Sequence, residues 1–324
     1  MDNYFNKVID EINKGERFLV ASHINPEGDA VGSALAMALG LKKLGKYSKV
    51  FFHDNVPHTF KFLDGAMDVV HKVGDDEIFD AAIVVDCGQL DRLGDNFETI
   101  KNKGKIINID HHITNNLFGD INFVIPEASS TGEIVYDLLN AMDVKITKDI
   151  AVNIYTSVLT DTGSFRYSST TPHALVVAAE MIKAGVDPWD ISQRIYESYP
   201  AKRFKLLGMV LDTLEVSEHG KIAVLVVTQD MLKRADADKE LTEGFVNFAR
   251  AIDGVEVGIL FRESKSGEYK MSFRSRGNID VAEIGSMFGG GGHKNAAGCN
   301  LQGTLEEVKE KILSATIEKI GGGK

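Results

Sequence analysis

Four segments of this chain carry side chains that could bind a metal ion or move a proton. The most informative is Asp110-His111-His112, which directly follows the mostly apolar run 105–109. Three such groups in a row cannot all be buried without partners, because uncompensated burial of polar groups costs several kcal/mol. A strand over 105–109 would deliver them to its carboxyl end, where open α/β sheets bind ligands.

The other three segments place similar side chains beside strand or helix ends; these residues are His23, Glu27, Asp29, Asp86 and Asp161. The first three lie on a tight loop between an apolar strand, 18–22, and a helical stretch, 30–44. The fourth ends the apolar run 81–85, and the fifth closes the helical stretch 150–159. Each alone has a simpler interpretation as a turn residue or a helix cap. Together, an imidazole and several carboxylates in one βα-repeating region predict a metal site.

The ligand types indicate which metal this would be. Carboxylate oxygens with a minority of imidazole nitrogens suit Mn²⁺ or Mg²⁺, with Fe²⁺ and Co²⁺ as alternatives. The chain has no cluster of thiolates that would point to structural zinc. The candidate ligands outnumber what one ion needs, so two ions that share a carboxylate are expected. Such pairs lie about 3.5–4 Å apart, lower the pKa of a bound water to about 7, and serve in-line phosphoryl displacement.

These segments resemble the four motifs of the DHH phosphoesterase family. Further matches are Val85-Asp86-Cys87-Gly88, Ser129-Ser130-Thr131-Gly132-Glu133 and, near the C-terminus, the run FGGGGHKNAAG at 288–298, which resembles the family's DHHA1 domain. The resemblance covers nearly the whole chain, and the surrounding residues are most similar to the family's phosphodiesterases of very short oligonucleotides.

The resemblance implies a role for each candidate. One ion would be held by His23, Glu27 and Asp86, and the other by Asp29, Asp86, His111 and Asp161. Asp110 would orient a ligand imidazole by accepting its other N–H, and His112 would face the substrate phosphate. Position 27 departs from the family, because Glu27 stands where Asp is most common.

The glycine run 289–292 predicts a second binding element. Four consecutive glycines are costly to order, and exposed successive N–H groups would form an anion-binding nest. A plain flexible hinge is the alternative. The expected substrate-binding residues are Arg274, Gly290, Gly291, Gly292, His293 and, after Asp161, Arg166, for which a structural ion pair is the alternative. In the family this second domain holds the nucleotide.

Composition and charge limit the classes of function. The chain has 324 residues, enough for two domains, and a net charge of −11. This charge disfavours a coat for long nucleic acids, which needs phosphate-neutralising cations, and favours a small anionic ligand in a focused site. No run approaches the roughly 18 apolar residues of a membrane span, and no secretory signal is visible. Cys87 and Cys299 have no disulfide or metal spacing, so a reducing cytoplasm is expected.

The predicted fold class is α/β. Strands at 17–22, 49–53, 81–86, 105–110 and 121–125, with helices between them, predict a doubly wound, mainly parallel sheet. We expect the DHH domain over 1–187 and a helical linker over 188–214, whose Lys202, Arg203 and Lys205 would form a solvated face.

The remaining residues, 215–324, predict a smaller mixed α/β domain of the DHHA1 type. Its expected strands are 221–227, 255–262 and 268–274, and its expected helices are 240–250, 280–288 and 304–319. The terminal run 321–324 is expected to be disordered.

The predicted function is a manganese-dependent phosphodiesterase and phosphatase of very short 5′-phosphorylated oligonucleotides, such as pApA, with 3′-phosphoadenosine 5′-phosphate as a further substrate. Hydrolysis of cyclic di-AMP uses the same chemistry and is the alternative. A nucleotide-binding regulator with an inactive centre is the alternative of another class, supported by Glu27 alone. A pyrophosphatase or a RecJ-type exonuclease fits less well. No long nucleic acid or membrane partner is expected, and the resemblance implies a homodimer formed through the first domain.

Overall fold

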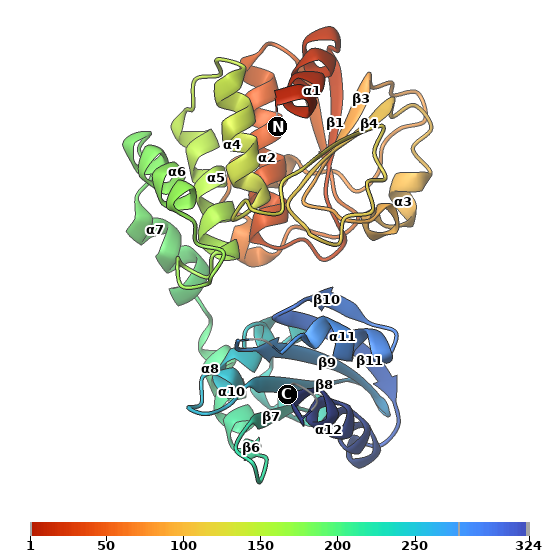
Figure 1. The fold of residues 1–324 in the computed structure, drawn as a ribbon, viewed down its shortest axis with the longest axis vertical. Helices are drawn as coiled ribbons and strands as arrows, with labels where there is room; N and C mark the ends of the chain where they lie inside the picture. Colours follow the sequence, from red (N-terminus) through yellow and green to blue (C-terminus); the bar gives the residue numbers. More distant parts are fainter. Residues whose placement is uncertain (1, 278, 322–324) are drawn as a thin grey trace. The chain divides into compact units, whose positions relative to one another are not determined.

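A computed structural model describes residues 2–277 and 279–321 of the chain, without the side chains of residues 2–4 and 293. The chain divides into two compact units, residues 1–198 and 199–324, which are described separately (Figure 1). The domain boundaries expected from the sequence stay a prediction. Of the terminal run 321–324 that was expected to be disordered, Gly321 is instead the last residue of a helix, and 322–324 lie outside the described residues. None of the helices within the described ranges is long and apolar enough to cross a membrane.

The first unit is built on the parallel sheet that the apolar runs predict. Its strands are β1 (Arg17–Ala21), β2 (Tyr47–Phe51), β3 (Ala81–Val85), β4 (Lys105–Asp110) and β5 (Ile121–Val124). They pair in parallel in the order β2-β1-β3-β4-β5. The change of direction in this order lies between β1 and β3, and ligands bind at such points in open α/β sheets.

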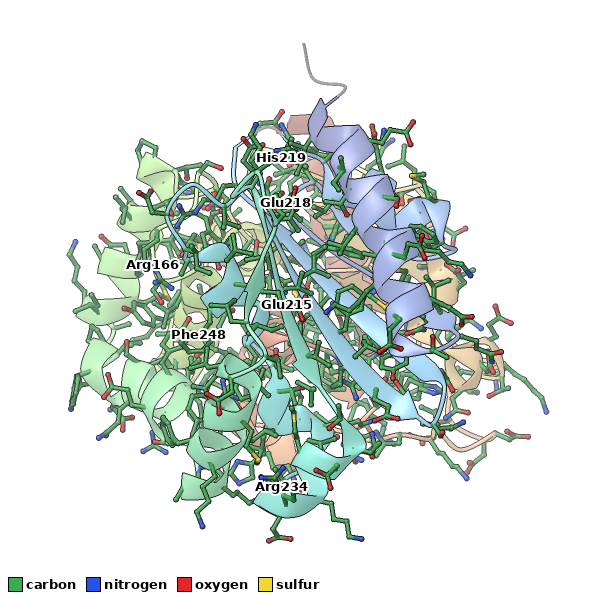
Figure 2. The ribbon with its side chains drawn as sticks, turned by 90° about the horizontal axis from the view of Figure 1, so that it is seen from below. Arg166, Glu215, Glu218, His219, Arg234 and Phe248 are labelled. Carbon is green, nitrogen blue, oxygen red and sulfur yellow. The ribbon has the colours of Figure 1, made fainter. Side chains whose placement is uncertain are left out.

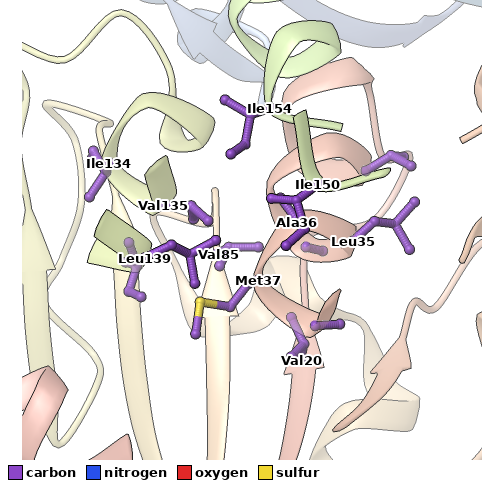
Figure 3. Close-up of a cluster of buried hydrophobic side chains, with 14 of the residues drawn as sticks. Val20, Leu35, Ala36, Met37, Val85, Ile134, Val135, Leu139, Ile150 and Ile154 are labelled. Atoms are coloured by element: carbon purple, nitrogen blue, oxygen red, sulfur yellow. The ribbon is translucent and has the colours of Figure 1, made fainter. Parts of the chain in front are cut away.

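Long helices cover one face of this sheet. The helices of the unit are α1 (Asp2–Lys14), α2 (Gly28–Lys43), α3 (Asp95–Glu98), α4 (Thr131–Ala141), α5 (Lys148–Asp161), α6 (Pro172–Lys183) and α7 (Pro188–Ser192), followed by a π-helical turn, η4 (Gln193–Glu197). Side chains of α2, α4 and α5 pack on alternate residues of β1 and β3, such as Val20 and Val85 (Figure 3). The sheet and these helices enclose the main hydrophobic core.

The expectation of a helix between every pair of strands is wrong. The chain between β2 and β3 forms only the 3₁₀ turns η1 (His58–Phe60) and η2 (Ala66–Asp68), and between β3 and β4 it forms η3 (Leu90–Leu93) and the four-residue helix α3. Proline and positive-φ glycine interrupt the first connection, as at Gly65 with φ +90°. The second face of the sheet is therefore covered by short turns over a smaller core.

The second unit contains a mixed sheet of six strands. Its strands are β6 (Glu215–Val216), β7 (Ile222–Val227), β8 (Val257–Lys265), β9 (Glu268–Ser275), β10 (Gly291–His293) and β11 (Ala296–Gln302), and its helices are α8 (Ala201–Leu211), α9 (Gln229–Ala235), η5 (Lys239–Thr242), α10 (Val246–Arg250), α11 (Val281–Met287) and α12 (Leu305–Gly321). The strand order is β10-β11-β9-β8-β7-β6, in which only β7 and β8 are parallel. Helices α11 and α12 pack on one face, and α8, α9 and α10 pack on the other.

Two expectations for this unit need correction. The single helix expected over 240–250 is broken into η5 and α10, because Gly244 between them has φ +77°. Arg203, expected on a solvated face, is only 9% exposed. Its guanidinium stacks on the Tyr199 ring at 3.9 Å and the Phe245 ring at 4.8 Å. It also donates to the backbone oxygens of Leu241 in η5 and of Glu243 just after it.

Replacing Arg203 by alanine is therefore expected to destabilise the chain by about 3 kcal/mol, from lost cation–π contacts and two charge-assisted hydrogen bonds. Urea unfolding measures this cost. The control is Lys205→Ala on the exposed side of the same helix, for which a change within about 0.5 kcal/mol is expected. Equal stabilities of the two variants would show that the buried contacts of Arg203 contribute nothing.

Candidate active site

The predicted metal-binding residues meet at the carboxyl edge of the parallel sheet. His23 follows β1, Asp86 follows β3, and Asp110 is the last residue of β4. Because β1, β3 and β4 are neighbours in the sheet, their ends lie side by side. The first turn of α2 adds Asp29, and the last residue of α5 adds Asp161. Elements far apart in sequence thus converge on one place.

His111 lies at the centre of this group. Its Nε2 atom is 3.6 Å from an oxygen of Asp29, 3.7 Å from one of Asp86 and 3.6 Å from one of Asp161. Among the described residues, two sets of three have ligand atoms close enough to share an ion: Asp29 with His111 and Asp161, and Asp86 with His111 and His112. The structure thus brings together the residues expected around the second ion.

Two histidines are oriented in the way that metal-binding histidines are. Nδ1 of His111 lies 3.2 Å from the carbonyl oxygen of Ala128, and Nδ1 of His23 lies 2.8 Å from that of Ile24. Donation of the Nδ1 proton to a carbonyl leaves the Nε2 lone pair for a metal. In both residues Nε2 faces carboxylates, with His23 Nε2 at 3.6 Å from Asp86.

These spacings fit ligands of a common ion better than hydrogen bonds. Nitrogen–oxygen distances of 3.6–3.7 Å around His111 are too long for hydrogen bonds. Two ligand atoms each about 2.1 Å from one octahedral ion lie about 3.0 Å apart at right angles and about 4.2 Å apart across the ion. The observed distances fall between these limits, so the residues present fit a divalent cation.

The electrostatics of the group also favour a bound cation. Burial and the negative charges of neighbouring carboxylates raise the pKa of Asp29 well above its usual value. Burial, with the charges of Asp86 and Glu27, raises the pKa of Asp161 to about 7. Without metal, these carboxyl groups repel one another in a poorly solvated place. A divalent cation would compensate this repulsion.

The histidines respond in the opposite direction. Burial opposes the charged imidazole, but the charge of Asp86 and other carboxylates outweighs it and raises the pKa of His23 and of His111 to about 9. Burial alone would raise the pKa of Asp86; the close approach of the His23 imidazole and the charges of the three histidines hold it below its usual value. The carboxylates of the site thus favour positive charge among them.

Asp29 is anchored by a segment whose role the sequence did not reveal. Its carboxylate accepts hydrogen bonds from the N–H groups of Thr131 and Gly132, at 2.8 and 3.1 Å, and from the Ser157 hydroxyl. These N–H groups begin α4, where a negative charge is favoured. A Cβ atom at Gly132 would lie 2.0 Å from Ser157 Oγ, so the close approach requires glycine. The sequence marked this segment only as a match to the family; in the structure Ser130 also caps α4 by accepting a hydrogen bond from the Glu133 N–H.

A second set of hydrogen bonds orients His112. Asp110 is fully buried, and one of its oxygens lies 2.6 Å from His112 Nδ1. Its other oxygen accepts a hydrogen bond of 2.6 Å from Asn115, which also donates to Asn108. The imidazole that Asp110 holds is thus that of His112, whereas Nδ1 of His111 faces a backbone oxygen. Asn108 and Asn115 were missed.

The loop that carries His23 and Glu27 is held in an unusual conformation. Asn25 has φ +53°, and its N–H donates to the Asp54 carboxylate at 2.7 Å. Asp86, on the neighbouring strand end, also has φ +53°. Such strain in non-glycine residues is typical of functional sites. Glu27 is exposed at the N-cap of α2 and belongs to neither three-residue ligand set found in the described part of the chain.

Arg166 lies on the turn that follows α5, and its side chain is exposed (Figure 2). Gly163, Ser164 and Phe165 have consecutive positive φ angles of 57°, 61° and 60°. Nε of Arg166 donates to the carbonyl oxygen of Gly163 at 2.7 Å. At least part of this guanidinium therefore stabilises the turn itself.

The glycine run of the second unit forms part of a hairpin and does not form the expected nest. Gly291 and Gly292 belong to β10, which pairs with β11. The N–H groups of Gly289 and Gly290 donate to backbone oxygens of α11, so they are not available to an anion. The structure describes the backbone of His293 in β10, but its side chain lies outside the described residues.

At three of these positions the backbone conformation or a close contact within the protein requires glycine. Gly289 has φ +72°, Gly292 has φ +146°, and a Cβ atom at Gly290 would lie 2.0 Å from the Gly298 oxygen. Neither requirement applies to Gly291, because its φ is not positive and a Cβ atom there would meet nothing within 4 Å.

Comparison with known proteins agrees with this architecture. A model described as the N-terminal domain of the DHH family matches residues 17–160, and a DHHA1 domain model matches residues 219–322. The chain is 34% identical to a bifunctional oligoribonuclease and PAP phosphatase NrnA of Thermus thermophilus, over 93% of this chain and 89% of the relative. It is 24% identical to the protein of the same description from Bacillus subtilis, over 91% of this chain and 92% of the relative.

A solved structure extends the agreement to the fold. The crystal structure of an exopolyphosphatase-related protein from Bacteroides fragilis superposes with a TM-score of 0.91 at 29% identity, covering 98% of this chain and 96% of the other. The RecJ structure from Thermus thermophilus, 14% identical with a TM-score of 0.57, is similar in fold and is covered over 54% of its length.

Proposed function

This chain belongs to the DHH phosphoesterase family and is a hydrolase of phosphodiester or phosphate bonds, and on that basis we propose that it hydrolyses very short 5′-phosphorylated oligonucleotides with the help of manganese. Dinucleotides such as pApA are the proposed main substrates, and 3′-phosphoadenosine 5′-phosphate is a further one. The descriptions of the relatives, oligoribonuclease and PAP phosphatase, support both substrate classes.

The observation that carries the proposal is the common orientation of His23 and His111. Both donate Nδ1–H to a backbone oxygen and point Nε2 at the carboxylate of Asp86. We propose two divalent ions with Asp86 between them, the first held also by His23 and Glu27, and the second by Asp29, His111 and Asp161. Such ions would supply Lewis acidity and a water of lowered pKa.

The protein's own groups would orient the phosphate and move the proton. Asp110 holds Nδ1 of His112, so its ring has a fixed orientation. Burial opposes the charged imidazole, but Asp110 and Asp86 outweigh it and raise the pKa of His112. A protonated His112 is a donor for a non-bridging phosphate oxygen or for the leaving group. Asn115 fixes Asp110 in turn and so acts through it.

Metal titration tests the two-ion proposal. Chain freed of metal by chelation should take up two Mn²⁺ per chain in calorimetry, and its thermal midpoint should rise with Mn²⁺ concentration, because an ion that binds only the folded state stabilises it. Hydrolysis should be absent without metal and return with Mn²⁺ more than with Mg²⁺. Uptake of a single ion with full activity would contradict the assignment of two sites.

We propose that nucleotide recognition involves Arg274, Gly290, Gly291, Gly292 and His293 of the second unit and Arg166 of the first. The register supports grouping Arg274 with position 293, since Arg274 on β9 pairs with Ala296 on β11, and Ala296 pairs with position 293 on β10. We also propose a homodimer formed through the first unit, which sedimentation velocity of the purified chain tests.

Gly291→Ala is expected to lower kcat/KM about tenfold while leaving the fold intact. The added methyl group meets no protein atom, so any loss of activity must come from a ligand that approaches this backbone. Gly208→Ala on α8, where a Cβ atom also meets nothing, is the matched control. Steady-state kinetics and thermal unfolding of both variants measure these effects. Full activity of Gly291→Ala would show that the ligand does not approach the backbone at this glycine.

A further inference from the structure

The two histidines that point Nε2 at Asp86 each pass their Nδ1 proton to a peptide group that also contacts a carboxylate. For His23 the acceptor is the carbonyl oxygen of Ile24, at 2.8 Å. The N–H of the same peptide group belongs to Asn25, and it donates to the carboxylate of Asp54 at 2.7 Å. One peptide group therefore lies between the imidazole and a carboxylate, with a hydrogen bond at either end.

His111 has the same arrangement in a different part of the unit. Its Nδ1 atom lies 3.2 Å from the carbonyl oxygen of Ala128. The N–H of that peptide group belongs to Ser129, and it donates to the buried carboxylate of Glu133 at 3.1 Å. The two arrangements share no residue, since one joins the loops after β1 and β2 and the other joins the end of β4 to the start of α4. Their recurrence at both histidines indicates a role in the site itself.

A helix cap alone does not explain the position of the Glu133 carboxylate. In a capping box, a glutamate at this position accepts the N–H of the capping residue, which is Ser130 in α4. Glu133 instead accepts the N–H of Ser129, whose peptide group carries the oxygen that faces His111. The carboxylate is thus directed at the peptide group that the histidine uses.

Asp54 likewise holds a loop that needs support from outside. Asn25 has φ +53° and precedes Pro26, which restricts its backbone further. On the other side, the N–H of Ile24 donates to the carbonyl oxygen of Arg92 at 2.7 Å. Among the described residues, no second group donates to the Asp54 carboxylate and no cation pairs with it. Its negative charge is therefore directed at the Asn25 N–H.

Such a chain of hydrogen bonds should strengthen the histidine as a metal ligand. Hydrogen bonds in series polarise one another, so a carboxylate on the N–H side makes the carbonyl oxygen a better acceptor. A stronger acceptor at Nδ1 fixes the imidazole ring and makes its Nε2 atom more basic. The backbone oxygen that faces each histidine thus carries part of the effect of a carboxylate.

We propose that Asp54 and Glu133 are positioning residues for the two metal ions, each of which strengthens one histidine ligand through the peptide group between them. Asp54 acts on His23 and so on the first ion, whereas Glu133 acts on His111 and so on the second. This inference rests on the two-ion arrangement of the proposed function and adds two residues that are not ligands. Its consequence is that the two ions can be weakened independently.

Exchange of each carboxylate for its amide tests this assignment, because Asp54→Asn and Glu133→Gln keep an oxygen acceptor and remove the charge. Calorimetric titration of metal-free chain with Mn²⁺ gives both dissociation constants, and His23→Ala identifies the first ion by removing its binding step. Each variant should raise the dissociation constant of its own ion about fivefold and leave the other unchanged. This is below the roughly 10- to 100-fold cost of losing a direct partner of a ligand, because a peptide group transmits only part of the effect.

Asp80→Asn is the matched control. The Asp80 carboxylate also accepts backbone N–H groups, those of Glu16 and Arg17 at 2.7 and 2.9 Å, but at the opposite end of β1 from the site. Both Mn²⁺ dissociation constants of this variant should stay within about twofold of those of the unaltered chain, as for a surface substitution. A general loosening of the unit, in contrast, would weaken both ions alike.

Equal weakening of both ions in Asp54→Asn and in Glu133→Gln, unchanged constants in both, or an equal change in Asp80→Asn would overturn this inference. The two-ion proposal would then stand, because the unaltered chain still binds two ions. An effect in one variant only would overturn the role of the other carboxylate. Uptake of fewer than two ions by the unaltered chain would overturn the two-ion proposal, and this inference with it.

Discussion

Replacing His111 with alanine is expected to lower turnover about a thousandfold or more and to reduce the metal content of the purified protein. Its Nε2 atom faces oxygens of three carboxylates, those of Asp29, Asp86 and Asp161, at 3.6–3.7 Å. Loss of a group that merely orients a ligand costs about 10- to 100-fold. Loss of a ligand itself should cost more, because the remaining carboxylates then hold the ion in a less defined position.

The matched control is His173→Ala, since His173 is an exposed histidine that pairs with Asp137 on the surface of the same unit. Turnover and metal content, measured by mass spectrometry of the purified variants, should match those of the unaltered chain. An active His111→Ala variant with its full metal content would show that His111 is not a ligand.

The neighbouring histidine is expected to behave differently, although the two are adjacent in sequence. His112→Ala should lower kcat about a hundredfold, the lower part of the range for a positioned acid, while the protein still binds its metal. The reason is geometric: Nδ1 of His112 is engaged by Asp110 at 2.6 Å, whereas Nδ1 of His111 is engaged by a backbone oxygen. Despite burial, Asp110 and Asp86 raise the pKa of His112, which suits a proton donor, whereas His111 Nε2 faces the three carboxylates of the proposed second ion.

The Asn115→Ala variant tests whether the orientation of His112 by Asp110 matters for turnover, as distinct from a general loss of structure in the site. It removes a hydrogen bond to Asp110 without touching the imidazole, so kcat should fall by less than in His112→Ala, with KM and metal content unchanged. Loss of metal from His112→Ala would contradict the division of labour and would favour His112 as a ligand beside Asp86, which lies 3.7 Å away.

The parallel sheet could be predicted because its strands are short apolar runs buried on both faces, such as 81–85. The connections were less predictable. Residues between β2 and β3 pack through isolated side chains such as Phe60 and Leu63 without forming a long helix. The hairpin of β10 and β11 was missed because glycine runs carry no alternation of polar and apolar side chains.

The polar side chains of the site could be identified from their types and from their positions after strands. Their supporting partners could not. Asp29 is held by Thr131 and Ser157, which are 102 and 128 residues away in sequence. Tertiary packing alone brings such partners together, so no local spacing in the sequence predicts them. The buried position of Arg203 was missed because it too depends on tertiary packing, whereas a basic residue on an amphipathic helix is usually solvated.

The most direct test of the proposed function is to incubate the purified chain with Mn²⁺ and, separately, with pApA, 3′-phosphoadenosine 5′-phosphate and cyclic di-AMP, and to follow the release of AMP. We expect rapid release from pApA, release also from 3′-phosphoadenosine 5′-phosphate, and slow turnover of the cyclic dinucleotide. Faster hydrolysis of cyclic di-AMP than of pApA would contradict the proposed substrate, and inactivity toward all three with tight nucleotide binding would favour a regulator with an inactive centre.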